Sequence, residues 1–374
     1  MVNSTNPPEI RALDPADVPQ IRSIVRRAFS PFVRISFHVT PNTLVAVDEG
    51  RVCGAVILKT VDSRNNRRTG IVSWIFVDPD YSGLGVAAHL RDAALDALAA
   101  NRCTRIVANI DRDNTNSTNL FAAAGFRAMG PGALFSIFGP GVIRIMRHTM
   151  HILDPGYALF VKDPADSGQV QTNLPTRPVL QLLATLVLHI PIVMLLLLRL
   201  LETPQWSPLL TYRLAAVVAG LLLLRSGAMW MAARYRGIAV RYHMWESGFL
   251  LSIGAAGLFG FLMPVTGALY PEGTFWSARE FRGPLATMAV AGLASVSAAT
   301  LVSIWASNTF SDPQVLAWVW WIRRAGAWFL LTDGLLPMYP FSAYNAARIY
   351  RWSRSAWVLT AGFSVAVAIM AMVW

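Results

Sequence analysis

A short glycine-containing turn between a predicted strand and a predicted helix is the most distinctive chemical feature of the chain. Residues 70–79 are rich in β-branched and aromatic side chains, which favours a strand, and Pro79 ends it. The next residues, Ser82, Gly83, Leu84, Gly85, Val86 and Ala87, run directly into a predicted helix that lasts to about Ala100. Free backbone N–H groups in such a turn, together with the helix dipole, bind phosphate or pyrophosphate. An ordinary strand-to-helix turn is the alternative interpretation.

A second polar motif follows the next predicted strand, residues 105–110. Residues 111–126 begin with a polar segment that opens a short helix, and this helix ends at Gly125 and Phe126. The side chains that define this motif are Asn114, Ser117, Leu120, Phe121, Gly125 and Phe126.

In this order, the two motifs resemble the GNAT acetyltransferase family over about residues 8–165. That family has a strand, a Q/R-x-x-G-x-G/A turn and a helix, followed by N-x-x-A/S-x-x-L-Y-x-x-x-G-F. The resemblance implies an α/β fold with a mixed central β-sheet flanked by helices, and acetyl-CoA as the co-substrate. It also implies that Ser82, Gly83, Leu84, Gly85, Val86 and Ala87 bind the pyrophosphate, that the main chain of Ile75, Phe76 and Val77 receives the pantetheine and thioester, and that Asn114 and Phe121 belong to the same site.

Two residues depart from the family pattern. Ser82 stands where glutamine or arginine is usual, and Phe121 stands where a tyrosine often protonates the leaving thiolate. Because phenylalanine cannot donate a proton, the resemblance leaves this role to water or to another group such as Tyr81.

The base that takes the proton of the attacking amine is also open. Asp111 and Asp113 lie just beyond the strand that lines the acceptor cleft in the family, and Asp111 is the predicted base. His148 and His151 are alternatives, since residues 142–162 are expected to supply the last two strands. Relay through water is a further alternative, and carboxylates in such a loop also act as helix caps.

Other elements of this half follow from apolar periodicity. Val18, Ile21, Ile24, Val25 and Phe29 recur at helical spacing after Asp14-Pro15, which predicts an amphipathic helix. Residues 42–50 and 51–60 read as a hairpin.

The charge distribution divides the 374 residues into two parts. Residues 1–176 carry 18 Lys/Arg and 15 Asp/Glu, and residues 177–374 carry 14 and 6, which together give the net charge of +11. The arginines of the second part stand beside apolar runs, which indicates membrane topology and no nucleic-acid binding. Two cysteines, Cys53 and Cys103, are too few for a disulfide framework.

The second part has runs long enough to cross a bilayer. The predicted organisation is an acetyltransferase domain at residues 1–165, a linker at 166–177 and a multi-pass domain at 178–374. Its α-helical segments, five or six in number, are expected at about 178–200, 213–233, 247–270, 284–306, 315–336 and 355–374. Basic residues after the second segment place the amino-terminal half in the cytoplasm, whereas six crossings would place a later basic loop outside. A re-entrant segment, at Pro264 or at the charged fifth segment, would remove this conflict.

The apolar half also resembles, more weakly, the membrane core of site-2 zinc proteases, in residues 283–285 and 336–340. That family needs HExxH and a later aspartate. The corresponding positions read Arg225-Ser226-Gly227-Ala228-Met229 and Phe341-Ser342-Ala343, and His189 and His243 have no partner at ligand spacing. The sequence therefore predicts no metal site and disfavours an active protease.

These observations predict a multi-pass protein of the cell membrane with a cytoplasmic amino-terminal domain. The expected activity is transfer of an acetyl or other acyl group from acyl-CoA to an amine acceptor associated with the lipid bilayer. The alternative is a non-catalytic acyl-CoA sensor coupled to a protease-like but zinc-free membrane domain.

Overall fold

The computed structural model describes residues 7–29, 31–35, 37–62, 68–163, 177–200, 208–273, 275–338 and 341–373. The chain forms two compact units. The amino-terminal unit comprises Met1–His151 and Ala158–Leu174, and the carboxy-terminal unit comprises Ile152–Tyr157 and Pro175–Trp374.

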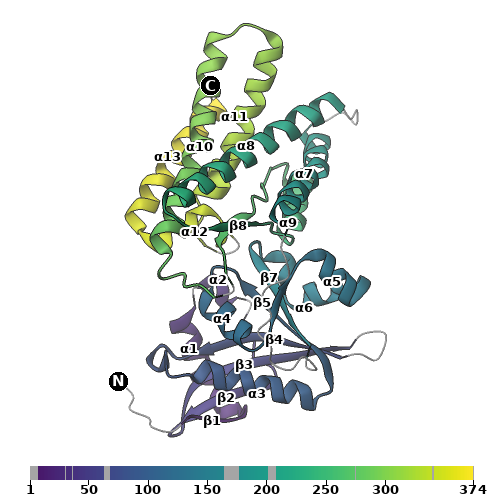
Figure 1. The fold of residues 1–374 in the computed structure, drawn as a ribbon, viewed down its shortest axis with the longest axis vertical. Coiled ribbons are helices and arrows are strands. Elements are labelled where there is room, and N and C mark those ends of the chain that lie inside the picture. The colour runs from purple at the N-terminus through teal and green to yellow at the C-terminus, as the bar shows by residue number, and fades with distance from the viewer. Residues whose placement is uncertain are drawn as a thin grey trace. The chain divides into compact units, whose positions relative to one another are not determined.

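The amino-terminal unit is built on a seven-stranded sheet in the order β1-β2-β3-β4-β5-β7-β6 (Figure 1). Its strands are β1 Glu9–Ala12, β2 Thr43–Asp48, β3 Arg51–Asp62, β4 Arg68–Val77, β5 Cys103–Asp111, β6 Arg127–Met129 and β7 Tyr157–Lys162. The pairs β1–β2, β2–β3, β3–β4 and β6–β7 are antiparallel, and β4–β5 is parallel. The prediction of a mixed central sheet is therefore confirmed.

Helices cover both faces of this sheet. They are α1 Val18–Ala28, α2 Pro31–Arg34, α3 Val86–Ala100, α4 Thr115–Ala123, α5 Pro131–Phe138 and α6 Val142–His148. Because side chains alternate along a strand, Val72 and Ala108 pack with α3, whereas Ile71 and Val107 pack with α5 and α6. The predicted helix after Asp14-Pro15, the hairpin of β2 and β3, and the helix ending at Ala100 are all present.

The prediction that residues 142–162 form the last two strands is wrong in its first half. Residues 142–148 form α6, and the penultimate strand is β6. Val142 and Ile145 are buried while Ile143 and Arg144 are exposed, which is a helical period and not an alternation. His148 therefore ends a helix, and His151 begins the short 3-10 helix His151–Leu153.

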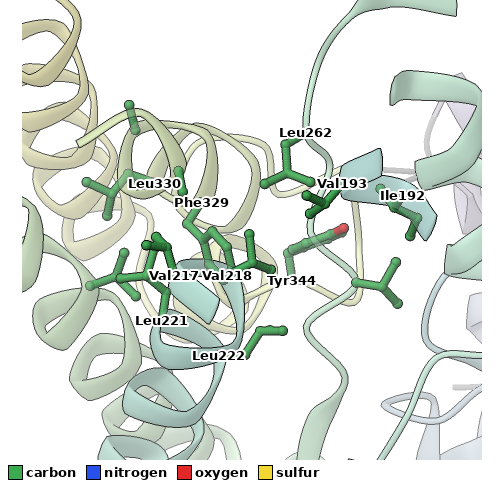
Figure 2. Close-up of a cluster of buried hydrophobic side chains, with 14 of the residues drawn as sticks. Ile192, Val193, Val217, Val218, Leu221, Leu222, Leu262, Phe329, Leu330 and Tyr344 are labelled. Carbon is green, nitrogen blue, oxygen red and sulfur yellow. The ribbon is translucent and has the colours of Figure 1, made fainter. Parts of the chain in front are cut away.

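The carboxy-terminal unit is mostly helical. Its helices are α7 Pro178–Leu200, α8 Pro208–Tyr235, α9 Gly248–Phe259, α10 Arg282–Thr309, α11 Pro313–Gly334, α12 Asn345–Trp352 and α13 Arg354–Val373, and the strands β8 Val240–His243 and β9 Ala268–Pro271 pair antiparallel. Figure 2 shows part of its apolar core, in which Val193 of α7, Val218 of α8 and Phe329 of α11 lie close to Leu262 and Tyr344.

Among the described residues, four helices are long and apolar enough to cross a membrane: α7, α8, α10 and α13. The expected number of five or six such helices is therefore wrong. At the third predicted segment, α9 has only 12 residues and ends at Gly260, which has φ +62°. At the fifth, α11 is a helix of 22 residues whose adjacent Arg323 and Arg324 lower its hydropathy.

Buried non-helical backbone follows α9, and side chains from other elements hydrogen-bond to its carbonyl groups. Non-helical backbone without such partners is costly away from water. The carbonyls of Met263, Pro264, Thr266 and Gly267 accept hydrogen bonds from Ser252, Tyr344, Tyr242 and Arg225, respectively. Pro264, one of the two places at which the sequence suggests a re-entrant segment, thus lies in non-helical backbone.

His189 joins its own helix, α7, to this stretch. Its Nδ1–H donates to Thr185 O of α7 at 2.7 Å, and its Nε2 accepts the N–H of Val265 at 3.1 Å. These two bonds give the side chain a structural role.

A buried ion pair joins α8 to α11. Arg225 donates Nε and Nη2 to the two carboxylate oxygens of Asp333 at 2.7 and 3.0 Å, and both side chains are almost fully buried. Asn345, at the start of α12, donates its backbone N–H and its side-chain amide to the same carboxylate. The two buried charges therefore neutralise each other.

Candidate active site

The central strands of the amino-terminal unit separate at one point, and the site begins there. β4 and β5 pair in parallel from Arg68–Cys103 to Val72–Ala108, and no pair of these strands follows among the described residues. On its other side, β4 continues to pair with β3 as far as Val77. The backbone of residues 74–77 therefore has one satisfied edge and one open edge. An open edge can hydrogen-bond an extended ligand.

The glycine turn lies at the end of this open edge. Gly83 and Gly85 have φ values of +86° and +79°, a conformation that side chains rarely adopt. A Cβ built at either glycine would meet nothing within 4 Å, so the backbone is open to a ligand on this side. Gly85 caps α3, and the first N–H groups of a helix have no partner within it. The turn thus fits a phosphate group.

Two arginines and two aspartates hold the turn. Asp78, which is 1% exposed, accepts hydrogen bonds from Arg27 of α1 and Arg51 of β3, and Asp80 pairs with the same two arginines at 3.3 and 3.1 Å. Hydrogen bonds from Arg51 and Arg27 lower the pKa of Asp80. This cluster ties the segment before Ser82 to α1 and β3 and so fixes the position of the glycines.

Tyr81, the predicted proton donor, lies against this cluster. Its side chain is 5% exposed, and Arg51 lies over its ring at 5.6 Å. Burial, followed by a hydrogen bond with Asp48, raises the pKa of the phenol. Tyr81 is therefore a weak acid whose hydroxyl is already engaged with a carboxylate.

Phe121 is buried at 2% exposure and packs edge-on against Phe126, with ring centroids 5.0 Å apart. Arg91 of α3 donates to the carbonyl of Leu120 at 2.8 Å and so joins α3 to α4. The phenylalanine ring thus completes the apolar core under α4 and offers no proton.

The polar loop before α4 contains a helix cap and a turn. Asn114 accepts the N–H of Ser117 at 3.3 Å, which makes it the N-cap of α4. Asp111 ends β5, and its Oδ1 accepts the N–H of Asp113 at 2.9 Å. The bond of Asp111 thus closes a turn before the helix, whereas the cap of α4 is Asn114.

His151 is fully buried and bonded to Asn109 of β5. Asn109 donates its side-chain amide to Thr149 O at 3.3 Å, so its Oδ1 is the atom that accepts from Nδ1 of His151, at 2.8 Å. Burial, and the nearby charge of Arg112, lower the pKa of His151 to about 3. The imidazole is neutral at physiological pH and holds Asn109 in place. Burial and nearby cations also lower the pKa of His148.

Ser73 of β4 is a polar residue at this site that the motifs do not include. Its Oγ is buried and has no hydrogen-bond partner among the described residues. The signal in the sequence is a single serine inside the otherwise apolar strand 71–77, as Asn109 is the polar residue inside 106–110.

No group of three or more His, Cys, Asp or Glu side chains that could hold a metal ion occurs in the described part of the chain. Cys53 and Cys103 are both free and buried, and burial raises the pKa of the Cys53 thiol to about 11. Neither thiol is suited to nucleophilic chemistry.

Comparisons with known proteins agree with this geometry. Residues 16–126 match the model of the acetyltransferase (GNAT) family. Two curated relatives are similar to the chain, both named N-alpha-acetyltransferase 30. The protein of Schizosaccharomyces pombe is 29% identical over 108 residues, which are 28% of this chain and 72% of the relative. The protein of Saccharomyces cerevisiae is 29% identical over 76 residues, which are 20% of this chain and 43% of the relative.

Solved structures are similar to the amino-terminal part at low identity. A GNAT family N-acetyltransferase of Escherichia coli in complex with CoA is 24% identical, with 45% of this chain and 87% of that chain covered and a TM-score of 0.31. The NatC complex bound to Gag peptide and CoA contains a chain that is 19% identical, with 42% and 99% covered and a TM-score of 0.31. The family match and the two curated relatives show that the amino-terminal unit of this chain is a GNAT-type N-acetyltransferase domain.

Proposed function

We propose that the chain is a membrane-anchored acyltransferase that moves an acetyl group from acetyl-CoA to an amine. The observation that carries this proposal is the position of Gly83 and Gly85, just past the end of the edge of β4 that opens where β4 and β5 separate. Acetyl-CoA is the co-substrate of a GNAT acetyltransferase domain. One ligand that has a pyrophosphate and a long amide-containing arm fits both the turn and the open edge of β4.

The predicted residues other than Tyr81 receive a role in this proposal. The amides of Gly83, Gly85, Val86 and Ala87 hold the pyrophosphate, while the main chain of Ile75, Phe76 and Val77 holds the pantetheine arm. Ser82 and Leu84 shape the turn, because their N–H groups donate to Pro79 O and Tyr81 O at 3.2 and 3.4 Å. Asn114 and Phe121 shape the same site through the start and the packing of α4. Asp111, at the end of β5, is the proposed base that takes the proton of the attacking amine.

The proton for the leaving thiolate is assigned to water. Phe121 cannot donate one, and the hydroxyl of Tyr81 is engaged with Asp48. The same two observations support the second candidate, a non-catalytic acyl-CoA sensor, because they leave the site without a side-chain acid. The sensor would bind acyl-CoA and release no CoA in the presence of an amine.

The membrane part of the proposal rests on the carboxy-terminal unit. Four helices long and apolar enough to span a bilayer support an anchor in the cell membrane. The basic residues Arg234, in the last turn of α8, and Arg236 and Arg241, after it, favour the cytoplasm for that end and for the amino-terminal unit. An anchored enzyme favours an acceptor that is itself at the membrane. We also propose that this unit is a scaffold similar to the site-2 protease core. It holds the Arg225–Asp333 ion pair and would carry out no protease chemistry.

Release of CoA by the whole protein tests the activity. The two curated relatives are named N-alpha-acetyltransferases, so the proposed first acceptors are peptides with a free α-amino group. The purified chain in lipid nanodiscs should release CoA from acetyl-CoA when a pool of Met-initiated pentapeptides is added, and mass spectrometry should find the acetylated peptides. Binding of acetyl-CoA without release of CoA, for peptides and for aminated lipids alike, would favour the sensor.

A further inference from the structure

Ser73 is an extra residue in β4 at the place where the central strands separate. β3 pairs Ile57 with Trp74 and Leu58 with Val72, so Ser73 has no partner residue on β3 and forms a bulge. On the other side, the last pair of β4 with β5 is Val72–Ala108. Ser73 therefore stands at the vertex of the opening between β4 and β5.

Ser73 and Asn109 are the first residues beyond the last pair of β4 with β5, Val72–Ala108, so one stands on each strand of the opening. In β5, Asn109 follows Val107 by two residues and shares its face, which packs with α5 and α6. In β4 the alternation of faces shifts at Ser73: Val72 packs with α3 before it, and Ile75 and Val77 pack with α3 after it.

The two polar side chains differ in how the protein holds them. Hydrogen bonds with Thr149 O and His151 fix the amide of Asn109. The Oγ of Ser73 is buried and meets no hydrogen-bond partner in the described chain. A buried hydroxyl without a partner is unfavourable. The geometry points to a ligand group as its partner.

The location of Ser73 fits the reacting end of the co-substrate. From Val77, next to the glycine turn, the open edge of β4 runs back to Ser73 over four residues, which is roughly 13 Å at the usual rise per residue. An arm that starts at the turn and follows this edge brings its thioester to the vertex. This step rests on the proposed function of the glycine turn.

We propose that the Oγ of Ser73 accepts a hydrogen bond from the attacking amine and directs the nitrogen lone pair at the thioester carbonyl carbon. The new C–N bond forms and the C–S bond breaks. One proton of the nitrogen passes to Asp111 or to water, and the thiolate takes a proton from water. Ser73 is thus a residue for the acceptor and not for acetyl-CoA.

Steady-state kinetics of three variants test this role in the whole protein, with the pool of Met-initiated pentapeptides as the acceptor. Ser73→Ala should raise KM for the peptides roughly three- to tenfold, as expected for a lost hydrogen bond, with an unchanged Kd for acetyl-CoA. Ser73→Thr keeps the hydroxyl and should restore most of the affinity. Ser136→Ala, at an exposed serine of α5, is the control and should match the wild type.

The outcomes separate the two proposals. Wild-type turnover with unchanged kinetics in Ser73→Ala would overturn the role of Ser73 and leave the proposed function standing. A higher Kd for acetyl-CoA in Ser73→Ala, with an unchanged KM for the peptides, would also overturn it. No turnover by the wild type would overturn both. A lower melting temperature of Ser73→Ala with wild-type kinetics would mean a purely structural serine.

Discussion

At the scale of single residues, polar atoms inside the sheet decide what the site can do. Ser73 and Asn109 are the polar residues of two otherwise apolar strand segments, and they stand on the two strands at the point where β4 and β5 separate. The motifs predict the phosphate-binding turn, since glycine types and spacing are visible in the sequence. They do not predict Ser73, because a bulge depends on pairing with β3, which no local pattern records.

His151 gives a prediction about acid stability. Its pKa is lowered to about 3 in the folded chain, against about 6.5 when unfolded. Below pH 6.5 the unfolded chain therefore binds a proton that the folded chain does not bind until about pH 3. Stability should fall as the pH decreases through this window, by up to about 1.4 kcal/mol per pH unit.

Chemical unfolding of the wild type and of His151→Gln at pH 7 and pH 5 measures this effect. The carboxylates are common to both proteins, so the difference between the two pH dependences isolates His151. The variant should lose less stability between pH 7 and pH 5 than the wild type. An identical loss in both would show that His151 is not buried in neutral form.

At the scale of elements, local sequence patterns predict a helix or a strand where that element buries one of its faces against a single apolar core. The helix α1, the β2–β3 hairpin and the start of α3 at Val86 all follow from apolar periodicity and turn residues. Residues 142–148 are harder to assign, because a run of seven apolar and basic residues is too short to distinguish a strand from a helix by its period. Similarly, the 24 residues of the third apolar run predict one long helix, but tertiary hydrogen bonds to residues 263–267 stabilise an interrupted one.

The Arg225–Asp333 pair gives a prediction about the carboxy-terminal unit. Asp333→Ala would leave the guanidinium of Arg225 buried without its carboxylate, which should cost about 3–5 kcal/mol of stability. The double variant Arg225→Met/Asp333→Leu removes both charges and should recover most of this loss. Unfolding in mixed micelles, with increasing sodium dodecyl sulfate, compares the variants.

A matched surface pair serves as the control for that measurement. Glu272→Gln breaks the half-exposed pair with Arg241 and should change stability by at most about 1 kcal/mol. If Asp333→Ala lowered the stability no more than Glu272→Gln does, the buried Arg225–Asp333 pair would not join α8 to α11 as described.

At the scale of the whole molecule, the chain combines a GNAT-type N-acetyltransferase domain with a unit that has four helices long and apolar enough to span a bilayer. The division into a charged half and an apolar half is visible in the composition, because lipid and water select different side chains. The number of membrane-spanning helices is less predictable. A helix break such as Gly260 shortens the helix that an apolar run forms, and charged residues such as Arg323 lower its hydropathy.

The most direct test of the central claim is calorimetric titration of acetyl-CoA into the whole protein in detergent. Gly85 and Gly50 form a matched pair, with φ values of +79° and +80° and open space around both. We expect acetyl-CoA to bind to the wild type and to Gly50→Glu, whose new side chain lies in the β2–β3 turn. Gly85→Glu should not bind acetyl-CoA, because its carboxylate enters the phosphate-binding turn. Equal binding of acetyl-CoA by Gly85→Glu, or no binding by a folded wild-type protein, would contradict the proposed acetyl-CoA site.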